Sequence, residues 1–275
     1  MEKSTKRLKV IEKIKLLEKE GKFHDEVEEN PESKVLLPKN VDYLNKKLIS
    51  KINTKIANKL AVKFFEGKIK SGDFIIKKIN GLENFDNIKG GAIITCNHFS
   101  IYDHYAVYRA MREYLNGKLL YKIIREGNYT SFKGLFGYLF RHCNTLPLSS
   151  NISTMKKFMN AVSILLNRGE KILIFPERAM WFNYRRPRPL ENGAFNIAVK
   201  NKVPVIPCFI TMEDTEKLDN DGFNIQAYTI NFSKPIYPIK EYADKQNLQY
   251  LKEKNYEIWK NIYEDFYGVP LSYGD

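Results

Sequence analysis

Residues 91–105 read GAIITCNHFSIYDHY, and this stretch contains a complete change from strand to helix. The apolar run GAIITC is short and uncharged, as expected for a buried strand. Ser100-Ile101-Tyr102-Asp103 has the spacing of a helix capping box, and we expect a helix over residues 102–115. A strand that leads directly into a helix predicts one βα unit of a parallel sheet.

The same alternation continues to the end of the chain. Further strands are expected at KLLYKII (118–124), NTLPL (144–148), KILIFP (171–176), VPVIPCFIT (203–211) and IQAYTINF (225–232). Helical patterns separate them at 130–142, 153–169 and 193–202, and a last helix over 248–266 ends at Gly268. We therefore predict an α/β protein with a mainly parallel central sheet flanked by helices.

Residues 1–74 differ from the rest and are predicted to form an N-terminal helical appendage to a main domain at residues 75–275. Apolar residues recur every fourth position in Leu44, Leu48, Ile52, Ile56, Leu60 and Phe64, beside Lys47, Lys51, Lys55, Lys59 and Lys63. This pattern is typical of a basic amphipathic helix. Because a four-residue repeat rotates by about 40° per step, both stripes spiral. The helix can therefore bind a membrane surface or pack on the domain with its lysines in water.

Composition narrows the class of protein. The chain has 275 residues, a formal net charge of +13 and three widely separated cysteines, so neither a disulfide framework nor a zinc knuckle is indicated. The positive charge favours an anionic partner such as nucleic acid, acidic lipid headgroups or a phosphorylated substrate. No apolar run approaches the roughly 18 residues of a spanning helix, so we expect a soluble or peripheral protein.

Polar residues that could take part in catalysis or binding follow two of the predicted strands. Asn97 and His98 come after GAIITC, and Glu177 comes after KILIFP. In a doubly wound sheet the functional site lies beyond the carboxyl ends of the strands. His98 can act as a base oriented by Asp103 if His98 lies in the loop and Asp103 in the first helical turn. The alternative is that Ser100 and Asp103 only cap the helix.

The segment after Glu177 is rich in arginine. Arg185, Arg186 and Arg188 lie between aromatic residues and prolines, and the planar guanidinium group suits bidentate binding of phosphate. Gly193 then opens a helix whose free amides could receive an anion. The alternatives are a surface salt bridge at Glu177 and a solvated loop after it.

Together these motifs resemble the glycerolipid acyltransferase family, whose best-known members acylate lysophosphatidic acid. The family pattern N-H-x-S-x-x-D is matched by Asn97, His98, Ser100 and Asp103, and the pattern F-P-E by Phe175, Pro176 and Glu177. Residues 192–195 (NGAF) and 203–207 (VPVIP) resemble two later blocks, in the same order.

The resemblance implies that His98 is the base, that Asp103 orients it, and that an acyl thioester on coenzyme A or acyl carrier protein is the donor. No other cofactor and no metal is implied. The acceptor would be a lysophospholipid, most simply 1-acylglycerol-3-phosphate, on an anionic membrane surface, and nucleic acid is not expected as a partner. We then expect a cytoplasmic, peripheral protein on the inner face of the cell membrane. The substrate-binding residues that we predict are Asn97, Ser100, Phe175, Pro176, Glu177, Arg178, Arg185, Arg186 and Gly193. Among them, the assignment of Arg178, Arg185 or Arg186 to the acceptor phosphate is a hypothesis from the residues and is not implied by the resemblance.

Two departures from the family leave the acceptor open. Residues 178–181 (RAMW) replace the family's G-T-R-S, and Ser149 replaces the arginine of its second motif. Another lysolipid, a glycolipid or a simple alcohol is therefore an alternative acceptor. Two other classes remain: a metal-dependent hydrolase that uses His98, Asp103 and Glu177 as ligands, and a basic binding module without catalysis.

Overall fold

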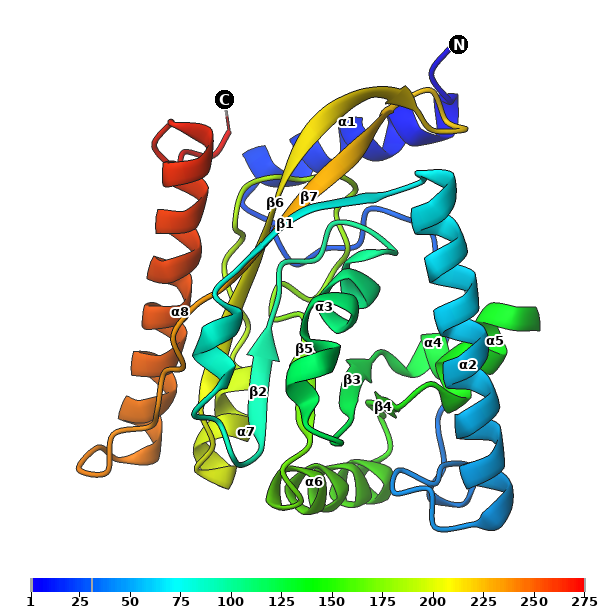
Figure 1. Cartoon of the computed structure of the whole chain (residues 1–275), viewed down its shortest axis with the longest axis vertical. Helices are drawn as coiled ribbons and strands as arrows, with labels where there is room; N and C mark the ends of the chain where they lie inside the picture. Colours follow the sequence, from blue (N-terminus) through cyan, green and yellow to red (C-terminus); the bar gives the residue numbers. More distant parts are fainter. Residues whose placement is uncertain (1, 31, 275) are drawn as a thin grey trace.

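A seven-stranded sheet forms the centre of the computed structural model, which describes residues 2–30 and 32–274 (Figure 1). The strand order is β1-β7-β6-β2-β5-β3-β4, and every neighbouring pair is parallel except β6 and β7. The strands are β1 Ile75–Asn80, β2 Ala92–Thr95, β3 Leu120–Ile124, β4 Thr145–Pro147, β5 Lys171–Ile174, β6 Val205–Leu218 and β7 Asn224–Phe232. The predicted mainly parallel α/β fold is confirmed.

Helices cover both faces of this sheet. One apolar cluster joins α2, α3 and α5 to one face, and a second joins α6, α7 and α8 to the other. The helices are α1 Thr5–Lys19, α2 Leu48–Ser71, α3 Asp103–Met111, α4 Glu126–Thr130, α5 Gly134–His142, α6 Ile152–Asn167, α7 Gly193–Asn201 and α8 Asp244–Tyr267. Short 3-10 turns lie at η1 Pro38–Asn40, η2 Leu82–Phe85 and η3 Arg112–Leu115.

Two elements differ from the sequence prediction. Strand β1 was not predicted, because its lysines Lys77 and Lys78 are exposed and interrupt the apolar pattern of an edge strand that pairs only with β7. The helix expected over 130–142 is found as α5, which begins later, at Gly134, and a short helix that was not predicted, α4, precedes it. The chain between them turns at Gly134, whose φ of +63° favours glycine.

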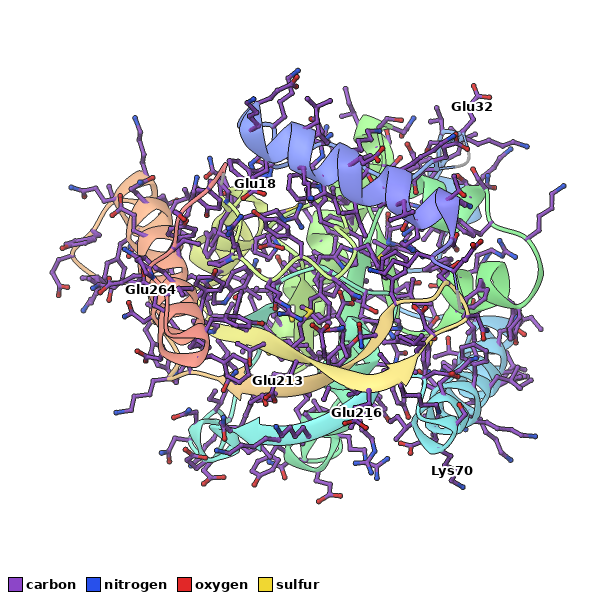
Figure 2. The ribbon with its side chains drawn as sticks, turned by 90° about the horizontal axis from the view of Figure 1, so that it is seen from above. Glu18, Glu32, Lys70, Glu213, Glu216 and Glu264 are labelled. Atoms are coloured by element: carbon purple, nitrogen blue, oxygen red, sulfur yellow. The ribbon has the colours of Figure 1, made fainter. Side chains whose placement is uncertain are left out.

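The two N-terminal helices lie on different sides of the molecule, with Glu18 labelled on α1 and Lys70 on α2 (Figure 2). Val10, Ile14 and Leu17 of α1 pack against Trp181 in a small separate apolar cluster. Helix α2 buries Ala57, Ala61 and Phe65 against the main domain. The division at residue 74 stays a prediction, and α1 contributes to packing around residues of the second part.

In the part of the chain that the structure describes, no helix combines the length and the apolar character needed to span a membrane.

Candidate active site

The ends of β2 and β5 bring the two polar motifs together. Thr95 pairs with Ile174 in parallel register, and the Cys96 amide donates to the Ile174 carbonyl oxygen at 3.1 Å. Asn97 and His98 therefore leave the sheet beside Phe175 and Glu177, although the two motifs are almost eighty residues apart. This juxtaposition follows from the parallel pairing of the two strands.

His98 and Asp103 are in direct contact. The ring Nδ1 of His98 lies 2.7 Å from Oδ2 of Asp103, which is fully buried at the first residue of α3. Because an ionised carboxylate can only accept, Nδ1 must carry the shared hydrogen, which leaves the lone pair on Nε2. The contact thus selects the tautomer in which Nε2 is free to act as a base.

Backbone amides hold the Asp103 carboxylate in place. Its Oδ2 also accepts from the amides of Phe99 and Ser100, at 3.2 and 3.3 Å, and its Oδ1 accepts from the amide of His104 at 2.6 Å. The bond to the Ser100 amide is one half of the predicted capping box. The other half differs from the prediction, because α3 begins at Asp103 with Tyr102, and not Ser100, as its N-cap residue. Ser100 Oγ in turn accepts from the Tyr102 amide at 3.2 Å. The capping and catalytic interpretations of this stretch are therefore compatible, since one carboxylate makes both sets of bonds.

The His98 ring is supported on one face and remains accessible. It stacks on Phe175 with ring centroids 4.2 Å apart and an interplanar angle of 22°. The side chain retains 23% of its exposure. A ring that is fixed at one edge and one face, yet reachable by a small group, has the geometry required of a general base.

The neighbouring histidine cannot share this role. Burial, together with the charge of Lys122, lowers the pKa of His104 to about 3, so this ring stays neutral. The thiol of Cys96, two residues before His98, is not a nucleophile at neutral pH, because burial raises its pKa well above the ordinary value.

The Glu177 carboxylate bonds the main chain of the loop that carries His98. It is 2% exposed, its Oε2 accepts from the amide of His98 at 2.9 Å, and its Oε1 accepts from the amide of Arg188 at 2.7 Å. The Arg188 guanidinium completes a buried ion pair with Oε2 at 2.9 Å. Both carboxylate oxygens thus bond groups of the protein itself. The predicted contact of Glu177 with the acceptor stays a prediction, and its visible contacts hold the loop.

Asn97 also bonds to the scaffold. Its Oδ1 accepts from the Ile210 amide at 2.8 Å, and its Nδ2 donates to the Ile210 carbonyl oxygen at 3.0 Å. This pair of bonds fastens the end of β2 to β6. Pro176 is buried beside Glu177, and its carbonyl oxygen accepts from the Glu191 amide at 2.8 Å, near the exposed Gly193 that begins α7.

The arginines predicted to bind the acceptor divide into two groups. Arg185 is paired with Asp214 at 2.9 Å, and Arg186 with Glu18 at 2.6 Å. Burial opposes the charge of Arg186, but Glu18 outweighs it and raises the pKa of the guanidinium. Arg178 follows Glu177 directly, is exposed, and makes no ion pair with a carboxylate of residues 2–30 or 32–274. Only Arg178 therefore remains open for an anionic ligand.

The three side chains considered as metal ligands bond other groups of the protein. No group of three or more histidine, cysteine or acidic side chains with metal-binding geometry occurs among the residues that the structure describes. Glu177, one of the three ligands considered from the sequence, accepts from Arg188 and from the His98 amide instead. A cation would compete directly with the buried guanidinium for this carboxylate.

A family model and a curated protein both match this chain. The family model described as Acyltransferase matches residues 77–211. A curated 1-acyl-sn-glycerol-3-phosphate acyltransferase, BAT2, chloroplastic, of Brassica napus is 27% identical over 176 residues, which cover 59% of this chain and 45% of that protein. This chain thus spans less than half the length of that relative. The resemblance seen in the sequence motifs is confirmed.

A solved structure supports the fold. The crystal structure of the 1-acyl-sn-glycerophosphate (LPA) acyltransferase PlsC from Thermotoga maritima superposes with a TM-score of 0.51, at 18% identity, over 82% of each chain. At this level of identity the similarity concerns the fold alone.

Proposed function

We propose that this chain, whose residues 77–211 match the Acyltransferase family, moves a fatty acyl group from a thioester to a hydroxyl of a lysophospholipid. The observation that carries the proposal is the 2.7 Å contact between His98 and Asp103 at the carboxyl end of β2, within the matched segment. The Brassica napus relative is a 1-acyl-sn-glycerol-3-phosphate acyltransferase. We therefore take 1-acylglycerol-3-phosphate as the first candidate acceptor.

In the proposed reaction Nε2 of His98 takes the proton from the acceptor hydroxyl as its oxygen attacks the thioester carbonyl carbon. Asp103 stabilises the imidazolium that forms. When the tetrahedral intermediate collapses, the carbon–sulfur bond breaks and the imidazolium returns the proton to the leaving thiolate. The products are an ester and a free thiol. A general base of this kind contributes about 10² to 10⁴ in rate.

The donor is proposed to be acyl-coenzyme A or acyl carrier protein, with no other cofactor. The acceptor phosphate is assigned to Arg178, because Asp214 and Glu18 already pair with Arg185 and Arg186. The free amides at the start of α7, from Gly193, are a second candidate contact for an anion. This assignment favours a phosphorylated acceptor, because a neutral glycolipid or a simple alcohol offers no anionic group for the Arg178 guanidinium to bind.

A membrane surface is the proposed location of the reaction. The first half of α2 leaves large apolar side chains exposed, with Leu48 at 74%, Ile49 at 60% and Ile56 at 47%. Leu135 and Phe136 of α5, which packs beside α2, are also exposed. Exposed apolar side chains among lysines are typical of a surface that binds anionic lipid, and each basic residue contributes about 1 kcal/mol. We place the protein on the cytoplasmic face of the cell membrane.

The proposed activity is tested by incubating the purified protein with acyl-coenzyme A or acyl carrier protein thioester and a panel of acceptors. The panel contains 1-acylglycerol-3-phosphate, lysophospholipids with larger headgroups, a monoacylglycerol and a simple alcohol. We expect mass spectrometry to detect the diacylated product of the phosphate monoester most strongly. Transfer to the monoacylglycerol or the simple alcohol alone would contradict the assignment of the acceptor.

The membrane proposal is tested by flotation with vesicles that contain phosphatidylglycerol. Replacing Ile49, Ile52 and Ile56 with serine removes exposed apolar area without touching the buried side of α2. We expect the vesicle-bound fraction to fall several-fold. The matched control is Ile152→Ser, which removes an exposed isoleucine from α6. Equal binding of the triple variant and the control would show that α2 is not the membrane surface.

A further inference from the structure

The main chain of His98 is held on both sides of the residue. Its amide donates to Oε2 of Glu177 at 2.9 Å. Its carbonyl oxygen accepts from the Trp181 amide at 3.0 Å and from Nη2 of Arg188 at 3.2 Å. None of these contacts involves the imidazole ring, which Asp103 and Phe175 hold separately. The position of the ring therefore depends on two independent sets of bonds.

Arg188 connects these bonds to the rest of the site. It has no exposed surface, and its Nη2 donates to Glu177 and to the Ala179 carbonyl oxygen at 2.9 and 2.6 Å. Its Nη1 donates to the carbonyl oxygen of Phe23 at 2.9 Å. The guanidinium carbon lies 4.6 Å from the centre of the Trp181 ring. One side chain thus joins the His98 loop, the segment after β5 and the N-terminal segment.

The local sequence suits this role. Arg188 lies between Pro187 and Pro189, so the backbone on both sides is restricted before the chain folds. A guanidinium presents several donors in a fixed plane, and here they serve three carbonyl oxygens and one carboxylate. A lysine in the same place would keep the charge but would lose the fixed directions of the bonds.

We propose that Arg188 is a positioning residue that sets the place of the His98 ring through the His98 main chain and Glu177. The proposal rests on the proposed acyl transfer at His98 and goes beyond it, because Arg188 is fully buried and bonds the main chain of His98, whereas Asp103 bonds its ring. Its removal lets the His98 peptide shift while Asp103 and Phe175 remain in place. A displacement of about 1 Å at a reacting group can cost about 100-fold in rate.

The kinetic test compares Arg188→Met, Arg188→Lys and a matched control, Arg7→Met. Arg7 also stacks on an aromatic ring, that of Phe182, and also pairs with a carboxylate, that of Glu28, but it does not contact the His98 loop. We expect kcat to fall about 100-fold in Arg188→Met and about 10-fold in Arg188→Lys. The KM for either substrate should stay within about twofold, and Arg7→Met should keep the wild-type kcat.

A second readout does not depend on activity. A ring hydrogen shared between a histidine and a buried carboxylate gives a far-downfield proton resonance, which His98→Ala identifies by its absence. We expect this resonance to shift or broaden in Arg188→Met and to persist unchanged in Arg7→Met. If the wild-type protein transfers no acyl group to any acceptor, the proposed function fails, while this resonance still tests the positioning role.

The proposal is overturned if folded Arg188→Met retains wild-type kcat and an unshifted resonance. If near-ultraviolet circular dichroism shows that Arg188→Met does not fold, Arg188→Lys decides by the same two criteria. A Lys variant with wild-type kcat and resonance would show that the charge alone suffices and that the directed bonds of the guanidinium have no positioning role.

Discussion

Two buried carboxylates act on His98 from different regions of the chain. Asp103 lies five residues away in α3 and bonds the ring, at 2.7 Å from Nδ1. Glu177 lies 79 residues away after β5 and bonds the peptide, at 2.9 Å from the amide. The first region is a local motif, whereas the second reaches His98 only because β2 and β5 pair. The chemistry of the ring and its position in space are therefore supplied by different parts of the fold.

The largest loss of activity is expected when the bond between Asp103 and the His98 ring is changed. Asp103→Asn replaces the charged partner of the His98 ring and can stabilise the wrong tautomer. We expect kcat to fall about 10³- to 10⁴-fold with little change in KM, as measured by initial rates of thiol release. Circular dichroism controls for folding. A folded Asp103→Asn variant within tenfold of the wild-type kcat would show that ring orientation is unimportant.

Replacing Glu177 should lower the stability of the protein as well as its kcat. Glu177→Gln keeps the shape but leaves the Arg188 charge buried without its partner, which costs about 3–5 kcal/mol in other proteins. We expect the free energy of unfolding in urea to fall by an amount of this order and kcat to fall about 100-fold.

A double variant, Glu177→Gln with Arg188→Met, checks the physical reason for that loss. Because it removes both charges, it should be less destabilised than the sum of the single variants. Additive losses would show that the two groups are not coupled, and would contradict the buried ion pair as the support of the loop.

The smallest effect is expected outside both networks. Arg178→Ala removes the exposed guanidinium beside Glu177, and we expect the KM for a phosphorylated acceptor to rise about 10-fold with kcat unchanged. The internal control is a monoacylglycerol acceptor, for which the KM should not change. Equal effects on both acceptors would remove Arg178 from phosphate binding.

The sequence predicted the Asp103 region well because the relevant residues are neighbours. A strand end and a helix start within fifteen residues made it possible that His98 lies in the loop and Asp103 in the first helical turn, and the structure has this arrangement with Tyr102 as the N-cap. The capping alternative did not have to be rejected, since one carboxylate serves both roles. The strands that carry the two motifs, β2 and β5, were predicted for the same reason: each is a short uninterrupted apolar run.

The Glu177 region could be predicted only in part. The strand end placed Glu177 near His98, but the partners of the arginines lie far away in sequence, as Glu18 lies 168 residues before Arg186. The prolines on both sides of Arg188 restrict its backbone, but they do not show that its side chain is buried while those of Arg185 and Arg186 pair near the surface. Their different environments depend on α1 and on the β6 strand, which pack against this segment from elsewhere in the chain.

The most direct test of the central claim is acyl transfer by His98→Ala beside the wild-type protein. Each is incubated with acyl-coenzyme A, or with an acyl carrier protein thioester, in the presence and absence of 1-acylglycerol-3-phosphate, and thiol release is followed. We expect wild-type release to require the acceptor and to exceed that of folded His98→Ala by about 10³-fold or more. Equal rates in the two proteins, or release that is indifferent to the acceptor, would contradict the account.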